Sequence, residues 1–129
     1  MKIVHIEACP VTLRMNESYV IAYETVSETT NLFLRLETSG GMSGYGCAAP
    51  DEPVTGETPH MLLQAVDSAV RPLLKGADPL RRAKLMQSLK IHLKERPSLL
   101  AAVDMALLDI LGKVCGLPLW KILGGFRDR

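Results

Sequence analysis

The sequence predicts an α+β domain in which a three-stranded antiparallel meander is followed by a bundle of helices. Up to Glu37, apolar residues alternate with polar ones, which is the period of a β-strand. After Pro50 they recur every three or four residues, which is the period of a helix. Because the strands precede the helices, the order is typical of α+β proteins and not of alternating α/β proteins.

Three segments have the alternation and the β-branched or aromatic composition of strands, namely residues 2–11, 19–23 and 31–37. The apolar residues expected on their buried faces include Val4, Ile6, Ala8, Leu32, Leu34 and Leu36. The polar stretch 12–18 breaks the alternation and is expected to be a connecting loop. Ser39–Gly41 supplies the turn after the last of these strands.

Three helices are expected to follow. Thr58 and Asp78 are expected N-caps, because a proline follows each of them at the first helical position, where a missing N–H costs nothing. Pro72 is expected to kink or end the first helix. Ser98 is the candidate cap of the last helix, 99–115. The basic residues expected on the solvent side of the second helix are Arg81, Arg82, Lys84 and Lys90.

Length, charge and composition exclude several classes of protein. A chain of 129 residues suffices for one domain core. Its formal net charge of +1 offers no field to attract nucleic acid or an acidic membrane surface, so neither partner is expected. Without a long apolar run or a signal peptide, the expected location is the cytoplasm. The three cysteines are expected to be reduced, buried thiols: Cys9, Cys47 and Cys115.

The string Gly44 to Ala49 matches the G-x-G-x-x-A fingerprint of dinucleotide-binding proteins. That fingerprint must open a helix whose N-terminus receives the pyrophosphate, but Pro50 and Pro53 follow it here. We therefore interpret the glycines as positions where the backbone bends, or approaches another element closely, at the end of a strand.

No residue of the chain is assigned a catalytic or metal-binding role. The candidate metal ligands lack the spacing of structural zinc sites: His5, Cys9, His60 and His92. Cys47 has no identifiable base and is interpreted as a packed thiol. Asp104 and Asp109 lie about 140° apart on an ideal helix, too far round for an acid–base pair. Asp109 is expected to pair with Lys113 instead.

Two blocks of sequence resemble the N-terminal domain of the enolase superfamily, in the mandelate racemase and muconate lactonizing enzyme group. The first comprises residues 36–46 and 54–58. The second, residues 102–125, has the pattern Ala-x-Asp-x-Ala-x-x-Asp followed by Leu-Pro-Leu-Trp-x-x-Leu-Gly-Gly. The resemblance implies that residues 1–116 form an α+β capping domain. Residues 117–129 would begin the connection to a TIM-like catalytic barrel that is absent from this chain, which is therefore expected to be a fragment.

The resemblance also implies an activity for the parent enzyme. Its barrel would hold Mg²⁺ and remove a proton α to the carboxylate of a small acid or dipeptide. The expected parent is a dipeptide epimerase or a related racemase or cycloisomerase, and this chain alone is expected to be inactive and to bind no Mg²⁺. The alternative is a stand-alone, non-catalytic interaction module with the same fold.

In the family that the chain resembles, two loops of the capping domain close over the barrel mouth and select the substrate. They correspond here to Arg14–Thr25 and Cys47–Glu57. The run 18–23 is similar to the Pro-Phe-x-x-Ala string of dipeptide epimerases. The substrate-binding candidates are Tyr19, Ile21, Glu24 and Val54. Glu24 stands where epimerases of acidic dipeptides have arginine, so its charge is expected to favour cationic substrates.

The last helix is apolar on nearly every side, and in the family one side packs on the barrel. Several residues are therefore expected to lack cover in this chain, namely Leu100, Val103, Leu107, Leu111, Leu119 and Trp120. The chain is expected to form a homo-oligomer that buries this helix against a second copy.

Overall fold

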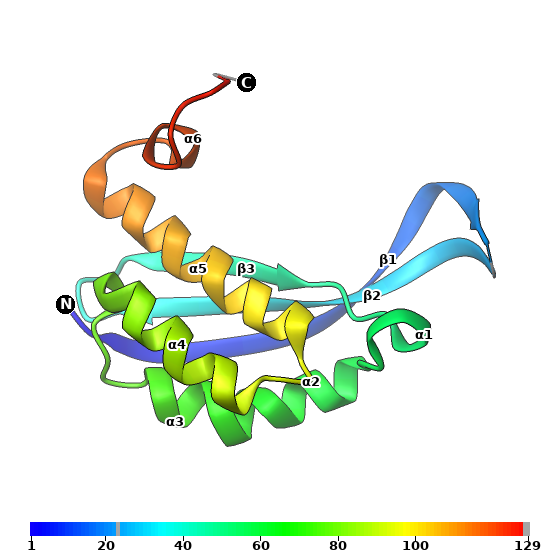
Figure 1. The fold of residues 1–129 in the computed structure, drawn as a ribbon, viewed down its shortest axis with the longest axis horizontal. Helices are drawn as coiled ribbons and strands as arrows, with labels where there is room; N and C mark the ends of the chain where they lie inside the picture. Colours follow the sequence, from blue (N-terminus) through cyan, green and yellow to red (C-terminus); the bar gives the residue numbers. More distant parts are fainter. Residues whose placement is uncertain (23, 128–129) are drawn as a thin grey trace.

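The computed structural model describes residues 1–22 and 24–127, and its strands form one antiparallel sheet in the order β1-β2-β3. The strands are β1 (Ile3–Ile21), β2 (Glu24–Thr38) and β3 (Ser43–Ala48). β1 and β2 are longer than β3, so they continue past the end of β3 as a projecting two-stranded hairpin (Figure 1). The predicted three-stranded antiparallel meander is confirmed as an architecture, although β3 was not among the segments expected to be strands.

The strand boundaries differ from the prediction. The loop expected at residues 12–18 is wrong, because β1 runs through this stretch and the Thr12 and Thr30 hydroxyls hydrogen-bond across the hairpin at 2.8 Å. The segments expected as strands at 2–11 and 19–23 are therefore the two ends of β1, with Tyr23 outside the described residues. This part of the hairpin is largely exposed on both faces, so it needs no apolar alternation to form a strand.

The buried face of the sheet agrees with the prediction on β2 and departs from it on β1. Leu32, Leu34 and Leu36 are all fully buried. Val4 is 47% exposed, contrary to expectation, because a bulge near the start of β1 turns Ile3 and Ile6 inward in its place.

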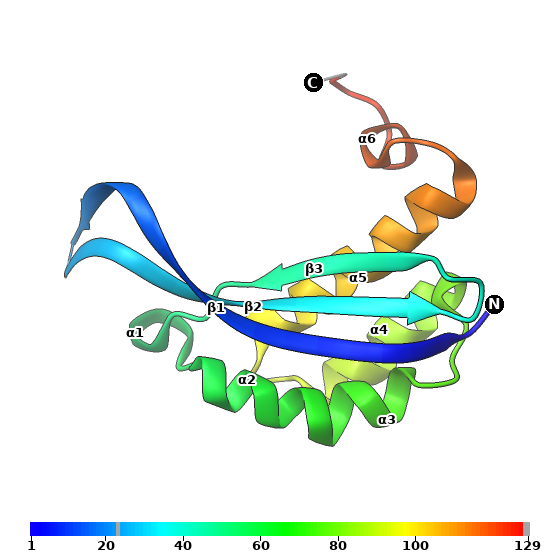
Figure 2. The ribbon, with the colours of Figure 1, turned by 180° about the vertical axis from the view of Figure 1, so that it is seen from behind.

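The helical part follows the sheet in sequence. Its elements are α1 (Glu52–Thr55), α2 (Pro59–Ala65), the π-helical turn η1 (Val66–Val70), α3 (Arg71–Leu74), the 3₁₀ turn η2 (Pro79–Arg81), α4 (Arg82–His92), α5 (Pro97–Cys115) and α6 (Leu119–Ile122). Helices α2, α3, α4 and α5 cover one face of the sheet, and the other face is open in the view from behind (Figure 2). The predicted α+β class is confirmed.

The predicted caps of the first two helices are confirmed. The Thr58 hydroxyl accepts a hydrogen bond from the Met61 N–H, and the Asp78 carboxylate accepts one from the Leu80 N–H. Pro72 does not end its helix. The π-helical turn η1 directly precedes α3, which contains Pro72. The wider turn lets the helix continue although proline has no N–H to donate.

The start of α5 differs from the prediction. Ser98 is not the cap but lies in the first turn, directly after Pro97, the first residue of the helix. The backbone N–H of Ser98 donates to the carboxylate of Glu57, 3.1 Å away. A residue 41 positions earlier thus takes the place of a local cap.

Helix α5 is central to the core, because it packs on both β3 and α4. Its buried residues include Leu99, Ala102, Val103, Ala106, Leu107 and Ile110. The expectation that Val103 and Leu107 lack cover is therefore wrong. Leu100, Leu111 and Leu119 are half-buried, and Trp120 is exposed.

One ion pair lies within α5, and another connects α4 to α5. The expected pair of Asp109 with Lys113 is confirmed at 2.8 Å. Arg82 does not face water as expected, but makes two hydrogen bonds of 2.6 and 2.7 Å to Asp104 on α5. This hydrogen bonding raises the pKa of Arg82. The contribution of protonated Arg82 to folding stability is therefore present below the ordinary arginine pKa. It is lost as the pH rises through the raised pKa of Arg82.

The cysteines are free thiols, as predicted, but their burial differs from the prediction. Cys47 is half-buried on β3, whereas Cys9 and Cys115 are exposed. Cys9 is exposed because it points to the open face of the sheet, opposite Phe33 in the register. Within residues 1–22 and 24–127, no helix has the length and apolar composition needed to cross a membrane.

Candidate functional site

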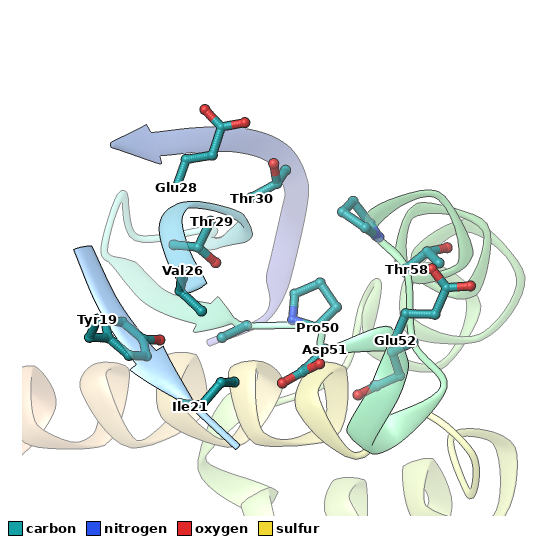
Figure 3. Close-up of a pocket in the computed structure, with 13 residues that line it drawn as sticks. Tyr19, Ile21, Val26, Glu28, Thr29, Thr30, Pro50, Asp51, Glu52 and Thr58 are labelled. Atoms are coloured by element: carbon teal, nitrogen blue, oxygen red, sulfur yellow. The ribbon is translucent and has the colours of Figure 1, made fainter. Parts of the chain in front are cut away.

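A cleft of about 420 Å³ opens between the projecting hairpin and the segment that follows β3. The hairpin contributes Tyr19 and Ile21 from β1 and four residues from β2, and the opposite wall comes from residues 49–52 and 57–59. Figure 3 shows Tyr19, Ile21 and Val26 on one side and Pro50, Asp51 and Glu52 on the other. The fold thus brings together the two segments that the sequence identified separately.

The candidate residues have different places in this cleft. Tyr19 and Ile21 line it. Glu24 lies opposite Ile21 in the β1–β2 register, but its side chain is outside what the structure describes. Val54 lies on α1, is 64% exposed and is outside the set of lining residues.

Several lining residues were missed by the sequence analysis, notably Val26, Glu28 and Thr30 on β2. They alternate in phase with the buried leucines further along the same strand. Continuing the period of two backwards from Leu32 would have placed them on this face. They were overlooked because β2 was expected to begin only at residue 31.

The charge of the cleft is negative. Acidic residues line both walls, namely Glu28, Asp51 and Glu52, together with Glu57, which is itself buried, whereas none of the described lining residues is basic. Carboxylates gathered around a concave surface produce a negative potential that attracts an ammonium or guanidinium group. The arrangement is therefore suited to hold a cationic group.

A metal ion does not fit the described residues of this chain. Among residues 1–22 and 24–127, no three His, Cys, Asp or Glu side chains lie close enough together to hold one. Carboxylates on opposite walls of the cleft can shape its potential without converging on a common ion.

Comparison with known proteins decides the family. Residues 4–124 match the model described as "Mandelate racemase / muconate lactonizing enzyme, N-terminal domain". The chain belongs to this family. The resemblance read from the two sequence blocks is confirmed, and the match extends across nearly the whole chain.

Several relatives in the family are named as epimerases. The chain is 40% identical over 129 residues to an L-Lys-D/L-Arg epimerase of Desulforapulum autotrophicum, covering 100% of this chain and 36% of the relative. It also resembles the structure of a dipeptide epimerase from Methylococcus capsulatus complexed with Mg and the dipeptide L-Arg-D-Lys. That match has a TM-score of 0.89 and 35% identity, and covers 96% of this chain and 35% of the other.

A substrate-liganded L-Ala-D/L-Glu epimerase from Bacillus subtilis has the same fold over this region. The TM-score is 0.93 at 30% identity, with 99% of this chain and 36% of that chain covered. The chain spans about a third of the length of the relatives it matches.

Proposed function

We propose that this chain is the capping and substrate-selecting domain of a dipeptide epimerase, an enzyme that removes and returns a proton α to a carbonyl group. Membership of the family and the epimerase names of its relatives support this proposal. The observation that carries it is the cleft, in which the hairpin and the segment after β3 meet as the two walls of one binding surface. Such walls orient a substrate and exclude water from it.

The catalytic groups of the proposed enzyme would belong to its barrel, which is also the proposed partner of this domain. Solved relatives are complexed with Mg, and we propose the same ion for the parent enzyme. Because the described residues of this chain do not fit a metal, the ion would be held by the barrel. The chain alone is accordingly proposed to be inactive.

The proposed substrate is a dipeptide with a cationic side chain. The acidic lining of the cleft would attract such a group and repel a carboxylate. The names of two relatives, each an L-Lys-D/L-Arg epimerase, agree with this preference. Each charge contact at a partly solvated site contributes about 1 kcal/mol, so several together give a substantial preference.

Self-association of the chain stays a prediction. The revised set of exposed apolar residues on α5 and beyond is Met105, Val114, Leu117, Trp120, Leu123 and Phe126. These residues concentrate toward the end of the chain, and either the proposed barrel or a second copy would cover them.

We expect the enzyme that contains this chain to exchange the α-proton of cationic dipeptides with solvent. In D₂O, NMR should show deuterium entering L-Arg-L-Lys at least about fivefold faster than L-Ala-L-Glu, which corresponds to one charge contact of about 1 kcal/mol. Removal of Mg²⁺ by EDTA should abolish the exchange, and added Mg²⁺ should restore it.

The 129-residue chain on its own is the control, and it should show no exchange above buffer. Exchange by the chain alone would contradict its proposed role as a capping domain. An enzyme that exchanges no dipeptide, or that prefers L-Ala-L-Glu, would contradict the proposed reaction or substrate class respectively.

A further inference from the structure

Glu57 is a buried charged residue whose role goes beyond lining the cleft. The residue lies between α1 and α2 and is only 1% exposed. A carboxylate is costly to bury unless hydrogen bonds replace its lost water. The buried carboxylate of Glu57 therefore requires a specific hydrogen-bond donor.

That partner is the start of α5. Both carboxylate oxygens of Glu57 face the backbone N–H of Ser98, at 3.1 and 3.4 Å. The N-cap residue of α5, Arg96, makes no side-chain capping hydrogen bond of its own. A negative charge at the N-terminus of a 19-residue helix is also favoured by the helix dipole. Glu57 thus caps α5 from a distant part of the chain.

The neighbouring residue ties the same point of the chain to a second helix. Thr58 caps α2 by accepting a hydrogen bond from the Met61 N–H. Two consecutive residues therefore fix the chain to α5 and to α2. This double attachment lies at the end of the segment that forms one wall of the cleft.

The wall itself has few attachments of its own. All four residues of α1 are exposed. The backbone hydrogen bonds of Val54, Thr55 and Gly56 are made to Asp51 and Glu52, within the same segment. These bonds shape the wall but do not fix it to the body of the domain, so its position depends on its two ends, β3 and Glu57.

We propose that Glu57 is a positioning residue, which fixes the wall carrying Asp51 and Glu52 by anchoring its end to the first turn of α5. The wall can then hold its carboxylates at a constant distance from the hairpin. The consequence for substrate binding rests on the proposed function, whereas the anchoring of the wall does not.

NMR relaxation of the 129-residue chain tests the anchoring. Glu57→Ala removes the carboxylate, and Glu57→Asp keeps the charge but shortens its reach by one methylene. In both variants the backbone order parameters of residues 51–56 should fall from about 0.85 to below about 0.6, while those of Leu32–Leu36 stay unchanged. Glu57→Gln keeps an acceptor oxygen for the Ser98 N–H and should preserve the wild-type values.

Thr58→Ala is the matched control, because it removes the adjacent cap and leaves Glu57 in place. It should loosen the start of α2 without lowering the order parameters of 51–56. If Glu57→Ala unfolds the chain, the order parameters of Glu57→Asp test the anchoring instead. Unchanged order parameters in Glu57→Asp, or an equal fall throughout the chain, would overturn the proposal.

Steady-state kinetics test the expected consequence for substrate binding. In the enzyme that contains this chain, Glu57→Asp should raise KM for L-Arg-L-Lys at least about fivefold and change kcat less than about twofold, since the wall binds but does not react. An unchanged KM would overturn the positioning role. A wild-type enzyme inactive on all dipeptides would instead refute the proposed function, and the relaxation data would still decide the anchoring.

Discussion

Replacing Gly46 by alanine should destabilise the domain by more than about 3 kcal/mol, because the added methyl group collides with the backbone of α5. A Cβ at this position would lie 1.9 Å from the carbonyl oxygen of Ala102 and 2.7 Å from its carbonyl carbon. Backbone atoms cannot rotate away as a flexible side chain can. Helix α5 would have to move off β3 and open the core that both elements share.

Gly40→Ala is the control, since a Cβ at Gly40 meets nothing within 4 Å. Its free energy of unfolding in urea should stay within about 0.5 kcal/mol of wild type. Equal stability of the two variants would show that α5 does not approach β3 as closely as described. The close approach also explains the G-x-G-x-x-A string: its glycines make room for a helix, as interpreted, although they lie within β3 rather than at a strand end.

Leu107→Ala should cost about 2–5 kcal/mol of unfolding free energy, because the leucine is 0% exposed and the shorter side chain leaves a cavity. Met105 lies on the same helix but is 47% exposed. Met105→Ala should therefore cost less than about 1 kcal/mol. Urea unfolding measures both, and a neutral Leu107→Ala would mean that this side of α5 is uncovered after all.

The sequence predicted those parts of the fold that local patterns determine. Proline after Thr58 and after Asp78 identified two helix starts, because each cap is made within three residues. The leucines of β2 identified its buried face through their period of two. The hairpin was misread because a strand exposed on both faces carries no such period.

Contacts between distant residues could not be predicted in this way. The cap of α5 comes from Glu57, 41 residues away, and the ion pair of Arg82 comes from Asp104, 22 residues away. For the site, the resemblance led to Tyr19 and Ile21, which line the cleft. The full set of lining residues could not be predicted from the sequence, because this requires knowing which segments face each other in the fold.

The most direct test of the proposed role as a substrate selector is to reverse charge in this domain while leaving the proposed barrel unchanged. Glu28→Arg and Asp51→Arg each replace the carboxylate of a residue that lines the cleft, one on the hairpin and one on the opposite wall. Asp67→Arg makes the same change at a well-exposed site on η1, away from the cleft. The quantity to measure is the ratio of kcat/KM for L-Arg-L-Lys to kcat/KM for L-Ala-L-Glu in the proposed enzyme that contains this chain.

We predict that each cleft variant lowers this ratio at least about fivefold, which is the effect of about 1 kcal/mol, and that Asp67→Arg leaves it within about twofold of wild type. A ratio that stays unchanged in both cleft variants, or that falls equally in Asp67→Arg, would contradict the claim that this domain selects the substrate.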